Sequence, residues 1–360
     1  MAYISHQTGN PLNDYFGFAS ECSAQPLNSL ELIGMKIPSS FPKAFLERYE
    51  VVFGPDVFKD VMNGFDAKRH TWFRINTLKG SVQDAFNLLD EEKVPYHRAE
   101  LFPDAGWVEF SDRDSLLAST AVRTQLVYIQ GFASQLPVRF LDITPGLKVL
   151  DLAAAPGSKT IQIAGLSHPE DEIAAVEVVR KRKFKLQDNL SMHGAGHIRV
   201  FLQDGTNVWK YRPEHFDRVL LDAPCSSEGR FQLSDEHSFG FWNASKVKEM
   251  VRKQRRLLFS AVHALKPGGT LVYSTCALSP EENEGAVDYV LNSFGDCLEV
   301  QPIALDLAER MQPIGMWRKK EYHSAVQQAC RLMPSEHMEG FFVCKFKKIA
   351  TSNPPLKFSR

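Results

Sequence analysis

Residues 148–160 read KVLDLAAAPGSKT: an apolar strand over 148–152, a turn of small residues, and a helix that starts at about residue 158. Similar apolar strands and intervening helices follow along the chain. Strands that alternate with helical segments form βαβ units, in which the strands are parallel. The pattern therefore predicts an α/β fold with a mainly parallel, doubly wound sheet. Its other expected strands are 173–177, 198–202, 218–222, 271–275 and 341–346, and its other expected helices are 179–192, 245–265 and 281–294.

A smaller α+β domain is expected before this sheet. Apolar residues between Phe45 and Val61 recur at helical intervals, and residues 71–78 alternate as a strand does. A helix over 81–92 and a further strand over 100–110 follow. The predicted parts of the chain are therefore an irregular arm (1–38), the small α+β domain (39–115), the larger domain (116–350) and a tail (351–360).

Composition limits the class of protein. The 360 residues are 44% hydrophobic and 24% charged, with a net charge of −1, as in ordinary globular proteins. Any surface that attracts nucleic acid must therefore be local. No apolar run reaches the roughly 18–20 residues that span a bilayer. The first 35 residues contain no Lys or Arg, which argues against a secretory or transit peptide. We expect a cytoplasmic monomer with no membrane partner.

The six cysteines stand at positions 22, 225, 276, 297, 330 and 344, and no two of them form a CxxC pair. This usage favours a reducing compartment and argues against a structural zinc site. We therefore expect no bound metal.

The turn at residues 153–159 is a candidate ligand site. Small side chains let a ligand approach the backbone, and the helix that follows offers free N–H groups. The turn is neither the GxGxxG fingerprint nor a phosphate loop, so a turn without a ligand fits it equally well. Glu177 stands 20 residues after Gly157 in the sequence (177 − 157). At this spacing after such a turn, an acid can accept hydrogen bonds from a ribose diol. Asp204 follows the third strand. The turn, Glu177 and Asp204 together fit a site for a dinucleotide or S-adenosylmethionine. Each acid taken alone fits an exposed residue at a strand end equally well.

Two thiols follow neighbouring strands. Cys225 stands in DAPCSSEG (222–229) after the fourth strand, and Cys276 ends the strand at 271–275. Because neighbouring strands lie about 4.8 Å apart, both sulfurs can reach one site. A single cysteine is more often a buried apolar residue. A disulfide is the other alternative, and the expected reducing compartment disfavours it.

A thiol beside an adenosine cofactor suits one reaction in particular. A thiolate that adds to ring carbon 6 of cytosine makes carbon 5 nucleophilic enough to attack a methyl sulfonium. Loss of the proton from carbon 5 then expels the thiolate. Asp222 can stabilise protonation at ring nitrogen 3, which makes the ring a better acceptor.

These motifs resemble the RNA cytosine-5 methyltransferases of the Nop/Sun family, and most closely the bacterial ribosomal (RsmF-like) branch. The resemblance runs from about Phe41 to Lys347 and rests mainly on the two cysteine motifs, 222–225 and 274–276. Further matches are residues 74–79, 128–130 and 340–342. Ser158 and Ser227 stand where glycine is common in the family. RsmF-like proteins also carry a carboxyl-terminal RNA-binding portion beyond the matched region.

The resemblance implies a Rossmann-like S-adenosylmethionine-dependent methyltransferase domain with a small amino-terminal RNA-binding domain. It makes Cys276 the nucleophile and Cys225 the residue that helps to release the product. Asp222 is the third catalytic residue. The cofactor residues that it implies are Ala153, Ala154, Ala155, Pro156, Gly157, Ser158, Lys159, Glu177, Arg182, Asp204 and Asp222.

The predicted function is methylation of cytosine carbon 5 in RNA, with ribosomal RNA favoured and transfer RNA second. A non-catalytic RNA-binding ribosome-assembly factor on the same fold is an alternative. An exocyclic-amine methyltransferase would typically carry an Asn/Asp-Pro-Pro-aromatic motif at 222–225, and a nicotinamide oxidoreductase would carry the glycine fingerprint. If Arg74 and Lys79 lie on the rim of the site, the small domain docks RNA. The basic clusters at 180–185, 252–256 and 318–320 are more often solvated helix faces.

Overall fold

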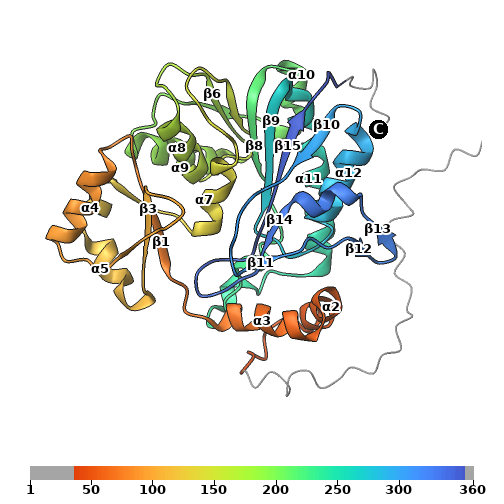
Figure 1. The fold of residues 1–360 in the computed structure, drawn as a ribbon, viewed down its shortest axis with the longest axis horizontal. Coiled ribbons are helices and arrows are strands. Elements are labelled where there is room, and N and C mark those ends of the chain that lie inside the picture. The colour runs from red at the N-terminus through yellow and green to blue at the C-terminus, as the bar shows by residue number, and fades with distance from the viewer. Residues whose placement is uncertain (1–35, 353–360) are drawn as a thin grey trace, which may run out of the picture. The chain divides into compact units, whose positions relative to one another are not determined.

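The larger sheet combines parallel and antiparallel strands (Figure 1). The computed structural model describes residues 36–352, so most of the predicted arm and tail lies outside the described residues. The strand order of this larger sheet is β11-β14-β15-β9-β8-β5-β6-β7, and β10 pairs with β15. The parallel strands are β5 (Val149–Asp151), β6 (Ile173–Glu177), β7 (Arg199–Leu202), β8 (Phe216–Asp222) and β9 (Leu265–Thr275). The antiparallel strands are β10 (Leu298–Gln301), β11 (Arg310–Met311), β14 (Cys330–Leu332) and β15 (Phe341–Lys348).

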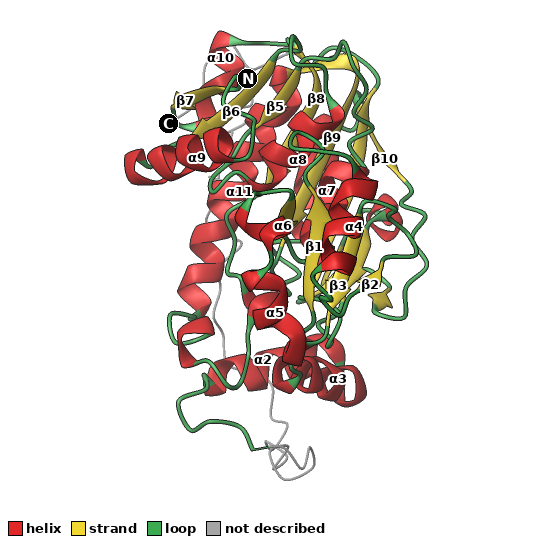
Figure 2. Ribbon diagram, turned by 90° about the vertical axis from the view of Figure 1, so that its left-hand side faces the viewer, coloured by secondary structure: helices red, strands yellow, loops and turns green. Residues whose placement is uncertain are grey.

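Helices cover both faces of this sheet, which confirms the predicted doubly wound α/β fold (Figure 2). Successive strand residues point to opposite faces, so each strand contributes to two cores. Val219 and Leu221 of β8 pack in the core with α11 (Ala244–Ala264) and α12 (Glu284–Phe294). Leu220 packs in the opposite core, whose helices are α7 (Phe132–Arg139), α8 (Ser158–Leu166) and α9 (Arg180–Met192).

A second sheet of four strands forms the small α+β part. Its order is β2-β3-β1-β4, made of β2 (His97–Arg98), β3 (Ala105–Val108), β1 (Thr71–Ile75) and β4 (Val127–Ile129). The helix α4 (Val82–Glu91) begins at a capping box between Ser81 and Asp84. Because β4 pairs with β1, this sheet extends to Ile129, whereas the predicted domain ended at residue 115.

The first two described helices do not belong to the small sheet. Residues of α2 (Lys43–Phe53) and α3 (Pro55–Asp66) make ring contacts with the segment that follows β8. The Phe45 ring lies 5.3 Å from the rings of both Phe231 and Trp242. Apolar spacing correctly predicted helices here, but it could not indicate their packing partner. The remaining α-helices and strands of the described residues are α5 (Arg113–Ala118), α6 (Thr120–Arg123), α10 (Val208–Tyr211), β12 (Met316–Trp317) and β13 (Lys320–Glu321).

Within residues 36–352, no helix combines the length and the apolar character that a membrane span requires.

Candidate active site

The two predicted thiols meet at the carboxyl ends of β8 and β9. These strands are parallel neighbours, with Asp222 opposite Ser274. The Sγ atoms of Cys225 and Cys276 lie 3.3 Å apart, and both residues are free and partly exposed. A disulfide bond measures about 2.05 Å, so this pair consists of two thiols in hydrogen-bond contact. The prediction that both sulfurs reach one site is confirmed.

The contact shifts the pKa values of the two thiols in opposite directions. A hydrogen bond from Cys225 lowers the pKa of the Cys276 thiol, and the positive charge of Arg230 lowers it further. The same contact, together with burial, raises the pKa of Cys225 well above its ordinary value. The thiolate is the nucleophilic form of cysteine. The pair therefore favours a thiolate at Cys276 and a proton on Cys225.

Asp222 lies between a lysine and a serine beside this pair. Its Oδ2 accepts a hydrogen bond from Lys159 Nζ at 2.6 Å, and its Oδ1 accepts one from Ser274 Oγ at 2.8 Å. Lys159 also donates to Ser134 Oγ at 2.8 Å. The carboxylate keeps 32% of its side-chain surface exposed, so a substrate can still reach it. Lys159, predicted as a cofactor residue, thus contacts the predicted catalytic acid.

The predicted cofactor turn is fixed through its backbone carbonyls. Arg182 Nη2 donates to Ala155 O at 2.7 Å, and Asn189 Nδ2 donates to Pro156 O at 2.9 Å. Gly157 has a φ of +113°, and a Cβ added there would lie 2.8 Å from a Leu186 methyl carbon, so this position requires glycine. The helix α8 that follows has no side-chain cap on its first N–H groups.

Glu177, the predicted ribose acid, and Asp204, a further predicted cofactor acid, differ in their surroundings. Glu177 is 3% exposed at the end of β6, where it accepts the Val179 N–H at 2.8 Å and pairs with Arg182 at 3.2 Å. The Asp204 carboxylate is exposed and accepts the Thr206 N–H at 2.9 Å, which caps its own turn. The structure therefore brings Glu177 and Arg182 to the cofactor turn, whereas the contacts of the Asp204 side chain are local.

Arg74 does not meet the condition, set for RNA docking by the small domain, that it lies on the rim of the site. Arg74 is 3% exposed and donates to Gln130 Oε1 at 2.8 Å and to Ser158 O at 3.1 Å. Its guanidinium lies 4.8 Å from the centre of the Tyr128 ring. Burial lowers the pKa of Arg74 to about 10. Arg74 thus joins the small sheet to the cofactor turn, while Lys79 is exposed.

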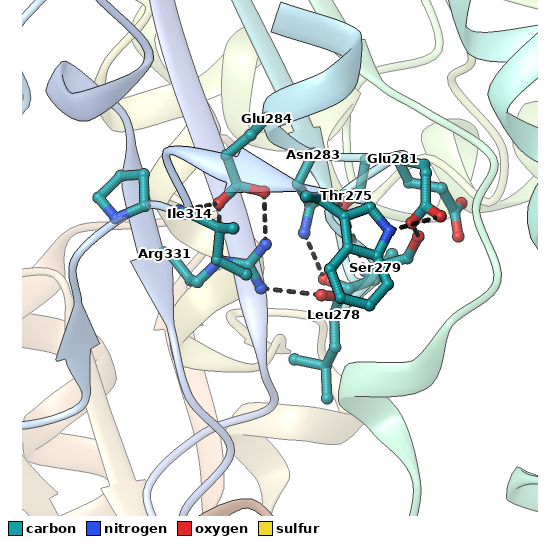
Figure 3. A network of polar contacts seen from close by, with 12 residues as sticks. Thr275, Leu278, Ser279, Glu281, Asn283, Glu284, Ile314 and Arg331 are labelled. Carbon is teal, nitrogen blue, oxygen red and sulfur yellow. Dashed lines mark hydrogen bonds and ion pairs between the residues drawn. The ribbon is translucent and has the colours of Figure 1, made fainter. Parts of the chain in front are cut away.

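The loop that follows Cys276 is held by buried polar groups (Figure 3). Asn283 accepts the Thr275 hydroxyl at 2.6 Å and donates to Ala277 O at 2.9 Å. Arg331 donates to Leu278 O at 2.9 Å and pairs through two nitrogens with Glu284, at 2.8 and 2.6 Å. Such bidentate pairs add geometric specificity. The position of this loop is therefore closely defined.

Sequence reasoning missed two carboxyl groups beside the thiols, Glu228 and Glu282. Both are fully buried, although acids in loops are usually exposed. Glu228 stands in the quoted segment 222–229 and Glu282 in the helix expected over 281–294, yet nothing in the sequence distinguished them from solvated acids.

Within the described residues, no group of three His, Cys, Asp or Glu side chains is arranged to hold a metal ion. An open pocket of about 590 Å³ lies between α3 and the segments 308–311 and 333–336, and it contains none of the predicted site residues.

The chain was compared with known families and proteins. A family profile described as "16S rRNA methyltransferase RsmB/F" matches residues 138–347. The ribosomal RNA small subunit methyltransferase F of Erwinia tasmaniensis is 35% identical over 324 residues, which cover 88% of this chain and 65% of that protein. The tRNA (cytosine(49)-C(5))-methyltransferase of Pyrococcus abyssi is 36% identical over 287 residues, covering 76% of this chain and 87% of that protein. The chain thus spans less than two thirds of the length of the ribosomal relative.

A solved structure agrees with these matches. A methyltransferase homologue from Pyrococcus horikoshii has a TM-score of 0.74 and 31% identity, covering 90% of this chain and all of that one. The family profile covers more than half of the chain, and it includes both thiols and the cofactor turn. The resemblance drawn from the two cysteine motifs is therefore confirmed, and the chain belongs to the RsmB/F family of 16S rRNA methyltransferases.

Proposed function

We propose that this chain transfers a methyl group from S-adenosylmethionine to ring carbon 5 of a cytosine in RNA, through a covalent adduct on Cys276. The observation that carries the proposal is the contact between Cys276 and Cys225, 3.3 Å apart beside Asp222. Ribosomal RNA is the favoured substrate, since the Erwinia relative is named for it. Transfer RNA is the second candidate, because the chain matches 87% of the archaeal transfer RNA enzyme.

The cofactor turn suits S-adenosylmethionine. The small side chains of residues 153–155, the uncapped start of α8 and the buried carboxylate of Glu177 offer backbone N–H groups and an acceptor for a ribose diol. When bound, this cofactor supplies a methyl group on an electrophilic sulfonium. The residues proposed to hold it are 153–159, Glu177, Arg182, Asp204 and Asp222.

The thiolate of Cys276 forms a bond to ring carbon 6 of the cytosine, which moves an electron pair toward carbon 5. Asp222, held by Lys159 and Ser274, is placed to stabilise the proton on ring nitrogen 3. Carbon 5 takes up the methyl group and then loses its proton to a base. The electrons of that C–H bond restore the ring double bond as the carbon–sulfur bond breaks, which frees the Cys276 thiolate. The Cys225 thiol stabilises the departing thiolate by a hydrogen bond.

Glu177→Gln is expected to weaken binding of S-adenosylmethionine about 10- to 100-fold, the range for losing one charged hydrogen bond. Gln can still accept the Val179 N–H, but it removes the charge paired with Arg182. Isothermal titration calorimetry measures the dissociation constant. Glu249→Gln, at an exposed carboxylate on α11, is the control. An unchanged constant for Glu177→Gln would remove this residue from the cofactor site.

Arg230→Gln is expected to move the acid limb of the pH–rate profile to higher pH. The charge of Arg230 lowers the pKa of Cys276, so its removal raises that pKa and leaves less thiolate at a given pH. The measurement is kcat/KM for methylation as a function of pH, which reports the free enzyme's essential groups. Arg199→Gln, at an exposed arginine on β7, is the control for a change in net charge. A profile that stays in place, or moves to lower pH, would show that Arg230 does not act on the nucleophile.

The activity itself is tested with labelled S-adenosylmethionine and RNA from a source that lacks the enzyme. Incorporation into small-subunit ribosomal RNA at carbon 5 of cytosine supports the proposal, and incorporation only into transfer RNA favours the second candidate. Absence of label from both RNAs would count against the function.

A further inference from the structure

Two buried carboxyl groups connect the segments that carry the thiols. Glu228 comes three residues after Cys225 (228 − 225), and Glu282 comes six residues after Cys276 (282 − 276). Both residues have 0% of their surface exposed. Burying a carboxyl group is costly unless hydrogen bonds or charges compensate it. The contacts of each group therefore indicate what it contributes.

Glu228 holds the backbone that follows Cys276. Its Oε2 accepts the N–H groups of Leu278 and Ser279, both at 2.9 Å. Its Oε1 accepts the Tyr49 hydroxyl at 2.5 Å and Trp242 Nε1–H at 2.7 Å. All four groups donate hydrogen bonds to the Glu228 carboxylate.

The neighbouring backbone reinforces this connection. The Gly229 N–H donates to Cys276 O at 2.9 Å. A Cβ at Gly229 would lie 2.0 Å from Gly340 O, so no larger residue fits where this segment passes the start of β15. The segment after Cys225 thus fixes the carbonyl of Cys276 and two of the next three peptide N–H groups.

Glu282 holds the residue that follows Cys225. It accepts the Ser226 N–H at 3.0 Å, the Ser226 hydroxyl, and Gln254 Nε2–H at 2.8 Å. Gln254 also donates to Pro224 O at 2.9 Å, and the Tyr273 hydroxyl donates to Glu282 O at 2.6 Å. Burial and the charge of Glu228 raise the pKa of Glu282 well above its ordinary value, which reduces repulsion between the two acids.

We propose that Glu228 and Glu282 are positioning residues whose reciprocal contacts hold Cys225 and Cys276 at the separation that product release requires. Each carboxyl group follows one thiol in the chain and binds the backbone beside the other. The inference rests on the proposed function, since it explains how the thiol that leaves and the thiol that assists it stay in contact. Connecting two loops through a buried acid is costly, because apolar contacts can connect loops with less loss of solvation.

Substitution by glutamine is expected to have different effects at Glu228 and at Glu282. At Glu228 either orientation of an amide turns an N–H group toward a donor that cannot accept, which is the Leu278 and Ser279 N–H groups on one side and the Trp242 N–H on the other. At Glu282 the Ser226 hydroxyl can accept as well as donate, so the amide of Glu282→Gln finds a partner for each atom. Glu228→Gln and Glu282→Leu should therefore disturb the thiol contact, whereas Glu282→Gln should rescue it.

The test follows Cys276 directly, without RNA. Alkylation of Cys276 by iodoacetamide is measured against pH and quantified by peptide mass spectrometry. The hydrogen bond from Cys225 lowers the pKa of Cys276, so losing that contact moves the alkylation profile to higher pH. Glu228→Gln and Glu282→Leu should shift the profile in the same direction as Cys225→Ala, which defines full loss of the contact. Glu282→Gln should stay closer to wild type than Glu282→Leu.

The rate of product release and cofactor affinity complete the experiment. Both disruptive variants should release methylated RNA about 100-fold more slowly than wild type, the effect of misplacing a reacting group by about 1 Å, with S-adenosylmethionine affinity close to wild type. If Glu228→Gln does not fold, Glu282→Leu and Ser226→Ala carry the test. A wild-type alkylation profile in a folded disruptive variant overturns the positioning role. Absence of methylation by the wild-type protein, with the profile shifts intact, overturns the proposed function, while the shifts still show that the two acids hold the thiols in contact.

Discussion

Replacing Cys276 with alanine is expected to lower methyl transfer by about 10⁴-fold or more, the scale seen when a nucleophile is removed from an enzyme that works through a covalent intermediate. Carbon 5 of cytosine becomes nucleophilic only after a group adds to carbon 6, and Cys276 is the thiol with the lowered pKa in this site. Neither Asp222 nor Lys159 can replace a sulfur nucleophile. Incorporation of labelled methyl groups into RNA measures the loss.

Cys297→Ala is the matched control, because Cys297 is a free, buried thiol in the connection between α12 and β10, outside the segments that carry the two thiols of the site. The control should methylate RNA as wild type does. The Cys276 variant should also bind S-adenosylmethionine normally, since Cys276 has no predicted contact with the cofactor. Methylation by Cys276→Ala at more than a few per cent of the wild-type rate would remove the nucleophile assignment.

Replacing Cys225 with alanine is expected to leave the RNA covalently attached to the protein. The Cys225 thiol lies 3.3 Å from the sulfur that must leave carbon 6, and its raised pKa keeps the proton needed for a hydrogen bond to the departing thiolate. Without it the adduct still forms, but it breaks down slowly. A denaturing gel should show a protein band shifted by the mass of the RNA.

The double variant Cys225→Ala, Cys276→Ala is the control for the trapped adduct, and it should give no shifted band. A Cys225→Ala protein that turns over RNA at the wild-type rate, without a shifted band, would show that Cys225 has no part in release.

Much of the candidate active site could be predicted, because its residues stand at the carboxyl ends of parallel strands. The carboxyl ends of parallel neighbours lie at one edge of a sheet, so Asp222, Cys225 and Cys276 had to be close once 218–222 and 271–275 were recognised as strands. Glu177 followed in the same way from the strand at 173–177.

The rest depends on partners that are distant in the chain. Arg74 is buried because Gln130 and the Ser158 carbonyl accept its hydrogen bonds, and no local pattern reports such acceptors. Glu228 and Glu282 are buried for the same reason. The strand β4, with only three residues, has too little alternation to identify it, so the predicted small domain ended before it.

The most direct test of the account uses RNA in which the target cytosine carries fluorine at carbon 5. Release requires a proton to leave carbon 5, and fluorine cannot leave as a proton does, so the adduct should persist in the wild-type protein once the methyl group is transferred. Protease digestion and mass spectrometry then identify the cysteine that holds the nucleotide. The account predicts a methylated fluorocytidine on Cys276 and none on Cys225. A nucleotide attached to Cys225, or no adduct with RNA that the enzyme methylates when it carries hydrogen at carbon 5, would contradict it.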